Sequence, residues 1–356
     1  MTDARWVEIP SFLKHDYEAV ASDNALGWEA LCGKTVLVTG ATGEIGREII
    51  KTLLWARKTQ KLSFRIIGLA RSQEKVRDIF NLWRLESPND FQFIYDDIRT
   101  FTVPSSVDFV IHAASPTASA FFIHNPVETL EAIADGTQHV LEMAREKNVT
   151  SLVFLSSMEV YGTINSENVR EEDYGPLDPL SVRASYPQGK RFAETLVASF
   201  ASQYGVPAKI VRPTQVFGTH LGDSDMRVYA QFARAARDGR DIVLHTKGET
   251  RRDYIYTIDA VRAILTVLFQ GKNGEAYNIS NPDNFLSIRQ MAELAASFSL
   301  SSRVLVDEEN GKNMGYAPTV CIRLNIEKLN GLNPFEKAPI EKMFRHLILD
   351  WKASNV

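Results

Sequence analysis

The feature that most constrains this chain is a glycine-rich loop between a short apolar strand and a helix. Residues 34–39 (KTVLVT) predict a buried strand, and residues 44–57 predict the helix that follows. The loop between them is spaced GxxGxxG, a variant of the dinucleotide fingerprint; the expected cofactor contacts are Gly40, Thr42, Gly43, Glu44, Ile45 and Gly46. Such glycines let backbone amides approach a pyrophosphate, whose charge the helix N-terminus favours. The alternative is a glycine-rich turn without a ligand.

Strands and helices continue to alternate along the chain. Strands are expected at residues 64–70, 91–95, 107–112, 151–156 and 209–212, and helices at 126–147 and 184–204. This rhythm indicates crossover units and a parallel sheet covered on both faces. The predicted fold class is therefore α/β, a Rossmann-type doubly wound parallel sheet with a smaller C-terminal lobe, because the rhythm changes after residue 212.

Composition excludes several classes of protein. A formal net charge of −4 argues against nucleic acid as a partner. No run of about 18 apolar residues occurs, so no membrane-spanning helix is expected. The two cysteines, Cys32 and Cys321, form no CxxC, and no histidines have metal-ligand spacing. We therefore expect no metal site and a cytoplasmic location.

Two residues on an expected helix form a candidate catalytic pair. Tyr186 and Lys190, four positions apart, lie on one helical face. A phenol has a pKa of about 10, and an adjacent ammonium is expected to lower the pKa of Tyr186 and make it a general acid/base. Ser157 follows the strand at 151–156, at the sheet edge where doubly wound folds bind ligands. It is placed to hydrogen-bond the hydroxyl that Tyr186 deprotonates.

The adenosine end of a dinucleotide is expected beside the second and third strands. An acidic residue usually follows the second strand to bind a free ribose 2′-hydroxyl, but residues 68–72 contain none. Arg71 and Ser72 stand there instead and can hold a 2′-phosphate, which favours NADP over NAD. The alternative for Arg71 is a solvated loop cation. Asp97 and Ile98, after the third strand, are expected near the adenine.

Four motifs in order resemble those of the extended short-chain dehydrogenase/reductase family. They are GATGEIG (40–46), HAAS (112–115), SSMEVYG (156–162) and YPQGK (186–190). A fifth segment, RRDYIYTIDA (251–260), is similar to the family's substrate-lobe motif, whose arginine holds a nucleotide diphosphate. The resemblance spans roughly residues 34–300 and is strongest to the NAD(P)-dependent nucleotide-sugar epimerases, dehydratases and decarboxylases, UDP-glucuronate decarboxylase among them.

The resemblance implies the roles of individual residues. Ser157, Tyr186 and Lys190 would be catalytic, acting on a nucleotide sugar through a transient 4-keto intermediate with a tightly held NADP or NAD. Further cofactor contacts are implied for Ala113, Ala114, Ser115, Tyr186, Lys190 and Pro213. Substrate contacts are expected from Ser115, Thr117, Gln215, Arg227 and Arg252. Ser115 is equally compatible with a simple turn, and Arg227 with a solvated helix position.

The residues after Ser157 bear on the reaction that follows the 4-ketone. In the family, hexose dehydratases usually carry Asp-Glu there, related dehydratases and decarboxylases Ser-Glu, and simple epimerases small or hydroxylated residues. This chain has Met158 and Glu159. Glu159 keeps a catalytic carboxylate in the position of a C5 base, unless it is a surface residue pointing away. Met158 has no proton to offer and is interpreted as packing, while Gln215, where relatives commonly have Asn, predicts an altered sugar pocket.

We expect the chain to have three parts and to form a homodimer. Residues 1–33 form a helical extension, 34–212 the dinucleotide-binding domain with 241–272 returning to it, and 213–240 with 273–356 the substrate-binding lobe. The helices at 126–147 and 184–204 resemble those through which the family dimerises, so a homodimer is expected. The leading expectation is an epimerase/dehydratase, and three other functions stay open: a nucleotide-sugar decarboxylase, an NADPH-consuming ketoreductase, and a catalytically retired cofactor-binding protein, which the intact Ser157, Tyr186 and Lys190 disfavour.

Overall fold

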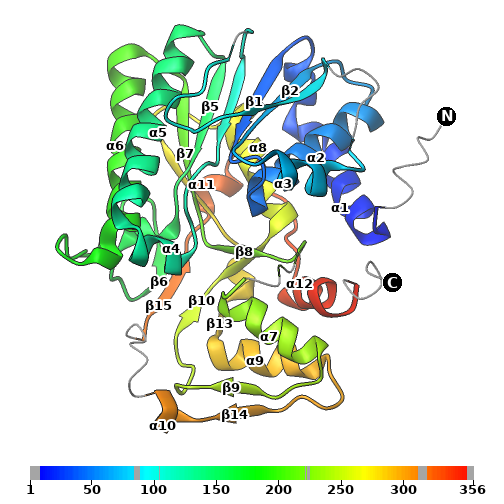
Figure 1. Cartoon of the computed structure of the whole chain (residues 1–356), viewed down its shortest axis with the longest axis vertical. Helices are drawn as coiled ribbons and strands as arrows, with labels where there is room; N and C mark the ends of the chain where they lie inside the picture. The colour runs from blue at the N-terminus through cyan, green and yellow to red at the C-terminus, as the bar shows by residue number, and fades with distance from the viewer. Residues whose placement is uncertain are drawn as a thin grey trace.

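The computed structural model describes residues 9–83, 89–103, 105–220, 222, 225–311 and 319–350. A large sheet flanked by helices forms one part of the molecule, and small sheets with two helices form the other (Figure 1). Within the described residues, no helix is long and apolar enough to cross a membrane.

The large sheet has seven strands, all paired in parallel, in the order β12-β7-β5-β4-β1-β2-β3. Their bounds are β1 (Thr35–Thr39), β2 (Arg65–Ala70), β3 (Phe91–Tyr95), β4 (Phe109–His112), β5 (Ser151–Leu155), β7 (Ala208–Pro213) and β12 (Ala276–Ile279). Every residue of β1 and β5 is buried, as the apolar runs predicted for strands covered on both faces. The Rossmann-type fold class is confirmed.

Helices cover both faces of this sheet because side chains along each strand alternate in direction. Val36 and Val38 of β1 join the core beneath α2 (Glu44–Thr59), α3 (Gln73–Phe80) and α8 (Thr257–Gln270). Leu37 joins the opposite core, beneath α5 (Pro126–Glu146) and α6 (Ser185–Tyr204). The chain reverses its direction of travel across the sheet between β1 and β4, which are neighbours. A doubly wound sheet binds ligands outside the carboxyl ends of its strands at such a point.

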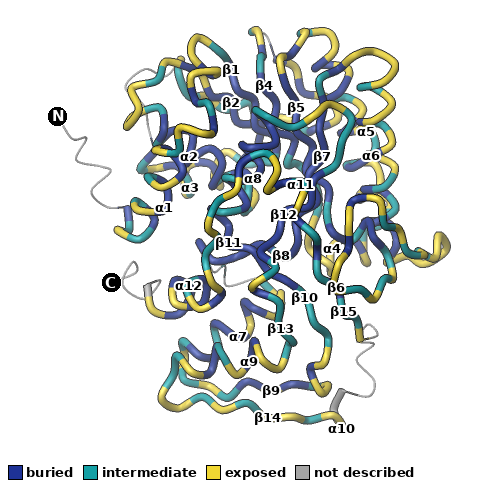
Figure 2. Tube along the Cα trace, turned by 180° about the vertical axis from the view of Figure 1, so that it is seen from behind, coloured by how far each residue is buried: buried dark blue, intermediate teal, exposed yellow. Residues whose placement is uncertain are grey.

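The smaller part is built mainly from the chain after β7, together with one earlier strand, β6. β8 (Gln215–Phe217) pairs with β11 (Tyr254–Tyr256), and a four-stranded sheet has the order β13-β10-β15-β6. Its strands are β6 (Ser166–Val169), β10 (Arg251–Arg252), β13 (Leu286–Ser287) and β15 (Cys321–Leu324). α7 (Val228–Arg237) and α9 (Ile288–Ser297) pack together beside β9 (Ile242–Leu244) and β14 (Val304–Val306). Figure 2 shows most of the large sheet buried, whereas in this outermost strand pair β9 is partly buried and β14 is half-buried to exposed.

Two of the expected boundaries are wrong. α8 does return to the large sheet, where it packs on β5 and β7, but β9, β10 and β11 within the expected return segment belong to the smaller part. β12 was expected in the lobe, yet it pairs with β7 and completes the large sheet. A strand of four residues contains no sequence pattern that predicts which strand it pairs with. The crossover connection through α8 determines the position of β12 in the sheet.

The described residues before β1 include helices, and residues 1–8 of the expected extension lie outside the described part of the chain. α1 (Ser11–Ala21) is followed by two 3-10 turns, Asn24–Leu26 and Trp28–Leu31. Tyr17 is fully buried and donates a hydrogen bond of 2.5 Å from its hydroxyl to Glu48 of α2. The extension is therefore part of the core that covers α2.

Candidate active site

The phosphate loop is packed so closely that only glycine fits at two of its positions. Gly40 has φ 67°, and a Cβ there would lie 2.7 Å from the carbonyl carbon of Ala113. A Cβ on Gly46 would lie 2.2 Å from the carbonyl oxygen of Gly40. The loop thus rests on the end of β4 and its helix approaches the sheet closely, as a dinucleotide cradle requires.

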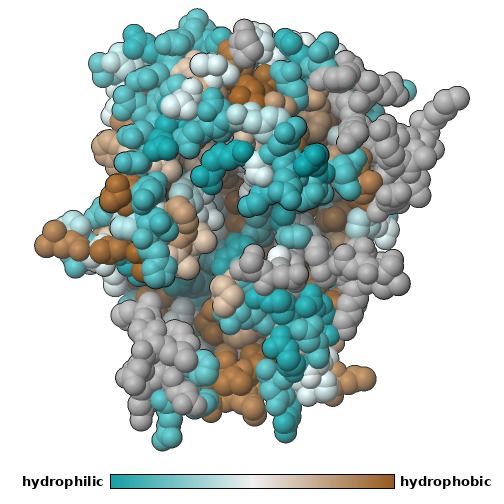
Figure 3. All heavy atoms as spheres, in the orientation of Figure 1, coloured by the Kyte–Doolittle hydropathy of each residue, from teal (hydrophilic) through white to brown (hydrophobic). Residues whose placement is uncertain are grey.

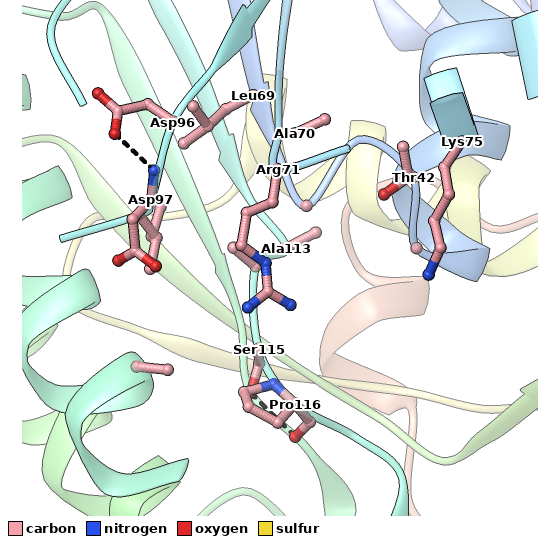
Figure 4. A pocket seen from close by; sticks show the side chains of 15 residues that line it. Thr42, Leu69, Ala70, Arg71, Lys75, Asp96, Asp97, Ala113, Ser115 and Pro116 are labelled. Carbon is pink, nitrogen blue, oxygen red and sulfur yellow. Dashed lines mark hydrogen bonds between the residues drawn. The ribbon is translucent and has the colours of Figure 1, made fainter. Parts of the chain in front are cut away.

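A cavity of about 300 Å³ opens beside this loop (Figure 4). Of the residues expected at the cofactor, it is lined by Gly40, Thr42, Gly43, Arg71, Asp97, Ile98, Ala113, Ala114 and Ser115. Glu44, Ile45, Gly46, Ser72, Tyr186, Lys190 and Pro213 do not line it. The cavity therefore collects the adenosine and pyrophosphate contacts, whereas Tyr186 and Lys190 lie beyond it.

Two cations line the cavity. Figure 4 shows the Arg71 guanidinium turned into the space between Asp97 and Ser115, with Lys75 on the side of Thr42. Lys75 was missed in the sequence, because Arg71 precedes α3 and no helical spacing relates the two. Ser72 instead caps α3, since its hydroxyl accepts a hydrogen bond from the Lys75 amide at 3.2 Å.

Tyr186, Lys190 and Ser157 come together at the carboxyl end of β5. The Tyr186 ring is 5% exposed and stacks on Phe122 with 5.2 Å between ring centroids. Lys190, one turn along α6, donates a hydrogen bond of 2.7 Å from Nζ to the carbonyl of Leu155. Its Nζ also lies 5.9 Å from the Tyr186 ring centroid. The local spacing of α6 and the end of β5 thus place all three residues as expected.

The pKa of Tyr186 moves in the direction opposite to the expectation. Burial raises the pKa of Tyr186 above its usual value, and the charge of Glu159 raises it further, whereas a hydrogen bond with Ser157 lowers it. Burial also lowers the pKa of Lys190 to about 7, so the expected ammonium is itself disfavoured. Both groups therefore favour their neutral forms in a site that excludes water.

Glu159 faces this site and Met158 does not. Glu159 is half-buried, and its charge acts on Tyr186, which disfavours the interpretation of an outward surface carboxylate. Ser157 caps the 3-10 turn that carries both residues, and its Oγ accepts a hydrogen bond of 3.2 Å from the Glu159 amide. Met158 is buried with Tyr161 and other residues of a small apolar cluster, as the packing interpretation expects.

His112, at the end of β4, supports the loop rather than the chemistry. Its Nδ1 lies 2.8 Å from Thr39 Oγ1 and its Nε2 lies 3.2 Å from Thr137 Oγ1. Burial, together with the charge of Lys190, lowers the pKa of His112 to about 3, so its ring is neutral. No cluster of metal-ligating side chains occurs among the described residues.

The candidate substrate residues are spread over both parts of the molecule. Arg252 on β10 is half-buried, and among the described residues nothing hydrogen-bonds its Nε. Thr219, two residues after β8, is another buried side chain whose Oγ1 lacks a partner within the described part of the chain, and sequence reasoning missed it. Gln215 is half-buried on β8, and Thr117 is exposed.

Arg227 is paired within the chain. It pairs with Glu44 at 2.6 Å and with Asp225 at 2.5 Å, and its expected substrate contact stays a prediction. Glu44 is not among the residues that line the cavity. Because Arg227 and Glu44 are far apart in the sequence, no local pattern signalled their contact.

The fold and this site define a Rossmann-type enzyme that binds a dinucleotide, and comparison with known proteins gives the family. The sequence profile of the NAD dependent epimerase/dehydratase family matches residues 36–280. The chain belongs to this family, as the ordered motifs indicated.

Individual relatives carry different reactions. The chain is 30% identical over 260 residues to UDP-glucuronic acid decarboxylase 6 of Arabidopsis thaliana, covering 73% of this chain and 72% of that protein. It is 28% identical over 332 residues to the human dTDP-D-glucose 4,6-dehydratase, covering 90% and 91%. Among solved structures, UDP-N-acetylglucosamine 4-epimerase from Methanobrevibacter ruminantium superposes with a TM-score of 0.75 at 21% identity, covering 91% and 99%. This last likeness concerns the fold.

Proposed function

We propose that this enzyme is a nucleotide-sugar epimerase/dehydratase that works through a transient 4-keto sugar. The observation that carries the proposal is the meeting of Ser157, Tyr186 and Lys190 beside Glu159, at the sheet edge next to the dinucleotide cavity. The buried, unpaired Nε of Arg252 supports a diphosphate site in the smaller part, because a charged group without a partner is costly to bury.

In this proposal Tyr186 and Lys190 transfer protons, and Ser157 orients the substrate. A bound nicotinamide supplies the hydride acceptor that allows C4 of the sugar to be oxidised and the donor that later reduces it. Tyr186 takes the proton of the 4-hydroxyl only after its own phenol proton has left, and Ser157 holds that hydroxyl in place. Lys190, whose pKa burial lowers to about 7, is partly neutral near pH 7, and the neutral amine can accept the phenol proton of Tyr186.

Glu159 extends the chemistry beyond simple epimerisation. Once C4 is a ketone, the C5 proton is acidic, and a carboxylate at this place can remove it. Decarboxylation is the second candidate, favoured by the likeness to a UDP-glucuronic acid decarboxylase. Because Met158 is buried and has no acidic proton, it does not protonate a leaving hydroxyl.

Product analysis in D2O tests this proposal. UDP-, GDP-, CDP- and dTDP-sugars are incubated with the enzyme and with Glu159→Gln, and products are weighed by mass spectrometry. We expect one sugar to lose water or carbon dioxide and to gain deuterium, and the variant to form this product slower by roughly 10²–10⁴-fold. An isomer of unchanged mass would make the enzyme an epimerase, and net consumption of NADPH would make it a ketoreductase. Cofactor binding without any turnover would favour the retired protein.

We further propose NADP as the preferred cofactor. No acid follows β2 to bind a ribose 2′-hydroxyl, and Arg71 and Lys75 both line the cavity. Two cations are suited to binding a 2′-phosphate. The Asp97 carboxylate accepts a hydrogen bond from Arg99, and this hydrogen bond lowers the pKa of the Asp97 carboxyl.

Cation removal tests the cofactor preference. In Arg71→Ala and Lys75→Ala the Kd for NADP should rise roughly tenfold or more, because a hydrogen bond to a charged group contributes about 1.5–3 kcal/mol. The Kd for NAD should stay the same, and Arg77→Ala, an exposed cation on the same helix, should change neither. Equal loss of both cofactors on calorimetric titration would contradict the 2′-phosphate assignment.

A homodimer and a cytoplasmic location complete the proposal. Leu130 of α5 and Phe192 of α6 are exposed apolar residues on the two helices expected at the interface. Figure 3 shows apolar side chains on a projecting segment at the left edge, where Leu180 and Val182 precede α6. Light scattering that finds only a monomer would contradict the dimer.

The free state of Cys32 and Cys321 suits a reducing compartment.

A further inference from the structure

The first residue of the phosphate-loop helix is an acid, and a cation from the other part of the molecule neutralises it. Glu44 begins α2, whose N-terminal amides form the expected pyrophosphate cradle. Its Oε2 accepts a hydrogen bond of 2.6 Å from Arg227, the N-cap residue of α7. This contact joins the dinucleotide-binding part to the smaller part, across 183 positions of sequence.

Arg227 is held firmly in this position. Asp225 accepts hydrogen bonds from Nε and Nη2 of Arg227 at 2.9 and 2.5 Å, and the guanidinium carbon lies 4.9 Å from the Tyr229 ring centroid. The Glu44 side chain is only 16% exposed, and its Oε1 is buried without a partner in the described part of the chain. Burial raises the pKa of Glu44, and Arg227 opposes that shift.

A carboxylate at this place is unfavourable for binding a pyrophosphate by charge alone. Two carboxylates, Glu44 and Asp225, flank a single guanidinium, so the group adds no net positive charge at the loop. What the arrangement does provide is a bridge between the two parts of the molecule at the N-terminus of α2. We therefore expect the ion pair to affect the rates at which a ligand binds to the cradle and leaves it.

We propose that the Glu44–Arg227 ion pair is a latch that ties the smaller part to the phosphate loop and slows the exchange of the bound dinucleotide. The latch rests on the proposed function, since it presupposes a dinucleotide in the cavity. Glu44 and Arg227 are positioning residues, because they act through the distance between the two parts rather than on the reacting atoms.

The test is a double-mutant cycle on cofactor exchange, using Glu44→Gln, Arg227→Gln and the double variant. Release is followed in a stopped-flow instrument as the fluorescence of bound NADPH or NADH falls during a chase with excess oxidised dinucleotide. Association is followed by mixing the apoprotein with the reduced form. If the pair is a latch, either single change breaks it completely, so all three variants should exchange dinucleotide about fivefold faster or more in both directions.

Plain electrostatics makes the opposite prediction. Removing Glu44's charge would slow release, removing Arg227's charge would speed it, and the double variant would return close to the parent rate. That pattern overturns the latch, as do unchanged rates. Arg240→Gln removes a cation from the same part of the chain, where Arg240 pairs with exposed Asp238, and should leave exchange unaltered. Parent enzyme that binds neither dinucleotide would instead refute the proposed function itself.

Discussion

Replacing Tyr186 with phenylalanine is expected to lower kcat by roughly 10²–10⁴-fold, the usual contribution of a positioned general acid/base. The change removes one oxygen atom and leaves the ring stacked on Phe122. The parent hydroxyl is buried, and burying a polar group costs desolvation free energy. The variant avoids this cost, so its free energy of unfolding should not fall below that of the parent. Turnover is measured on the sugar that the product analysis identifies, with cofactor affinity measured in parallel.

The same helix supplies a matched control. Tyr204 ends α6, is 42% exposed and lies far along the helix from the site, so Tyr204→Phe should keep full activity. Loss of turnover in Tyr186→Phe with intact cofactor binding would support its role in proton transfer. Full activity would eliminate Tyr186 as the general acid/base, and loss of cofactor binding would show a structural role instead.

The largest expected change in stability is at a buried ion pair behind the site. Arg212 at the end of β7 is 2% exposed and donates hydrogen bonds from Nε and Nη2 to the two carboxylate oxygens of Glu194, at 2.9 and 2.7 Å. Its Nη1 also donates to Tyr161, in the turn that carries Ser157, at 3.0 Å. Glu194→Ala leaves the guanidinium buried and uncompensated, which should cost about 3–5 kcal/mol of unfolding free energy.

Urea denaturation measures this cost, and an exposed pair provides the comparison. Arg289 and Glu293 are four positions apart on α9 with both side chains more than half exposed, so Glu293→Ala should cost less than about 1 kcal/mol. Because the pair supports the turn at Tyr161, Glu194→Ala should also reduce kcat in whatever protein remains folded. Similar costs for the two variants would mean that water reaches Arg212 and compensates its charge.

The parts of the site that sequence reasoning found are those with short-range signals. Gly40 follows β1 directly, Gly46 lies in the first turn of α2, and Tyr186 and Lys190 are one helical turn apart, so their relative placement was set by local geometry. Lys75 had no such signal, because Arg71 precedes α3 and a lone lysine on a helix is common.

The parts that were missed or wrong depend on which distant segments meet. Nothing near Arg227 in sequence shows that Glu44 lies within hydrogen-bond distance. β12 was expected in the smaller part, because a four-residue strand has no preference among sheet edges.

The pKa values of the catalytic residues belong to this second group. The spacing of Tyr186 and Lys190 suggested an ammonium beside a phenol, but burial changes the cost of charge on both, and burial is a property of the packed chain.

The sequence alone indicated the doubly wound sheet, the phosphate loop and the candidate catalytic residues, because strand and helix periods, glycine spacing and short motifs act over a few residues. Only the tertiary structure decided that Glu159 faces Tyr186, that Glu44 meets Arg227 and that Lys190 has a pKa of about 7. These are consequences of long-range contact and of the exclusion of water, and neither is encoded in the spacing of neighbouring residues.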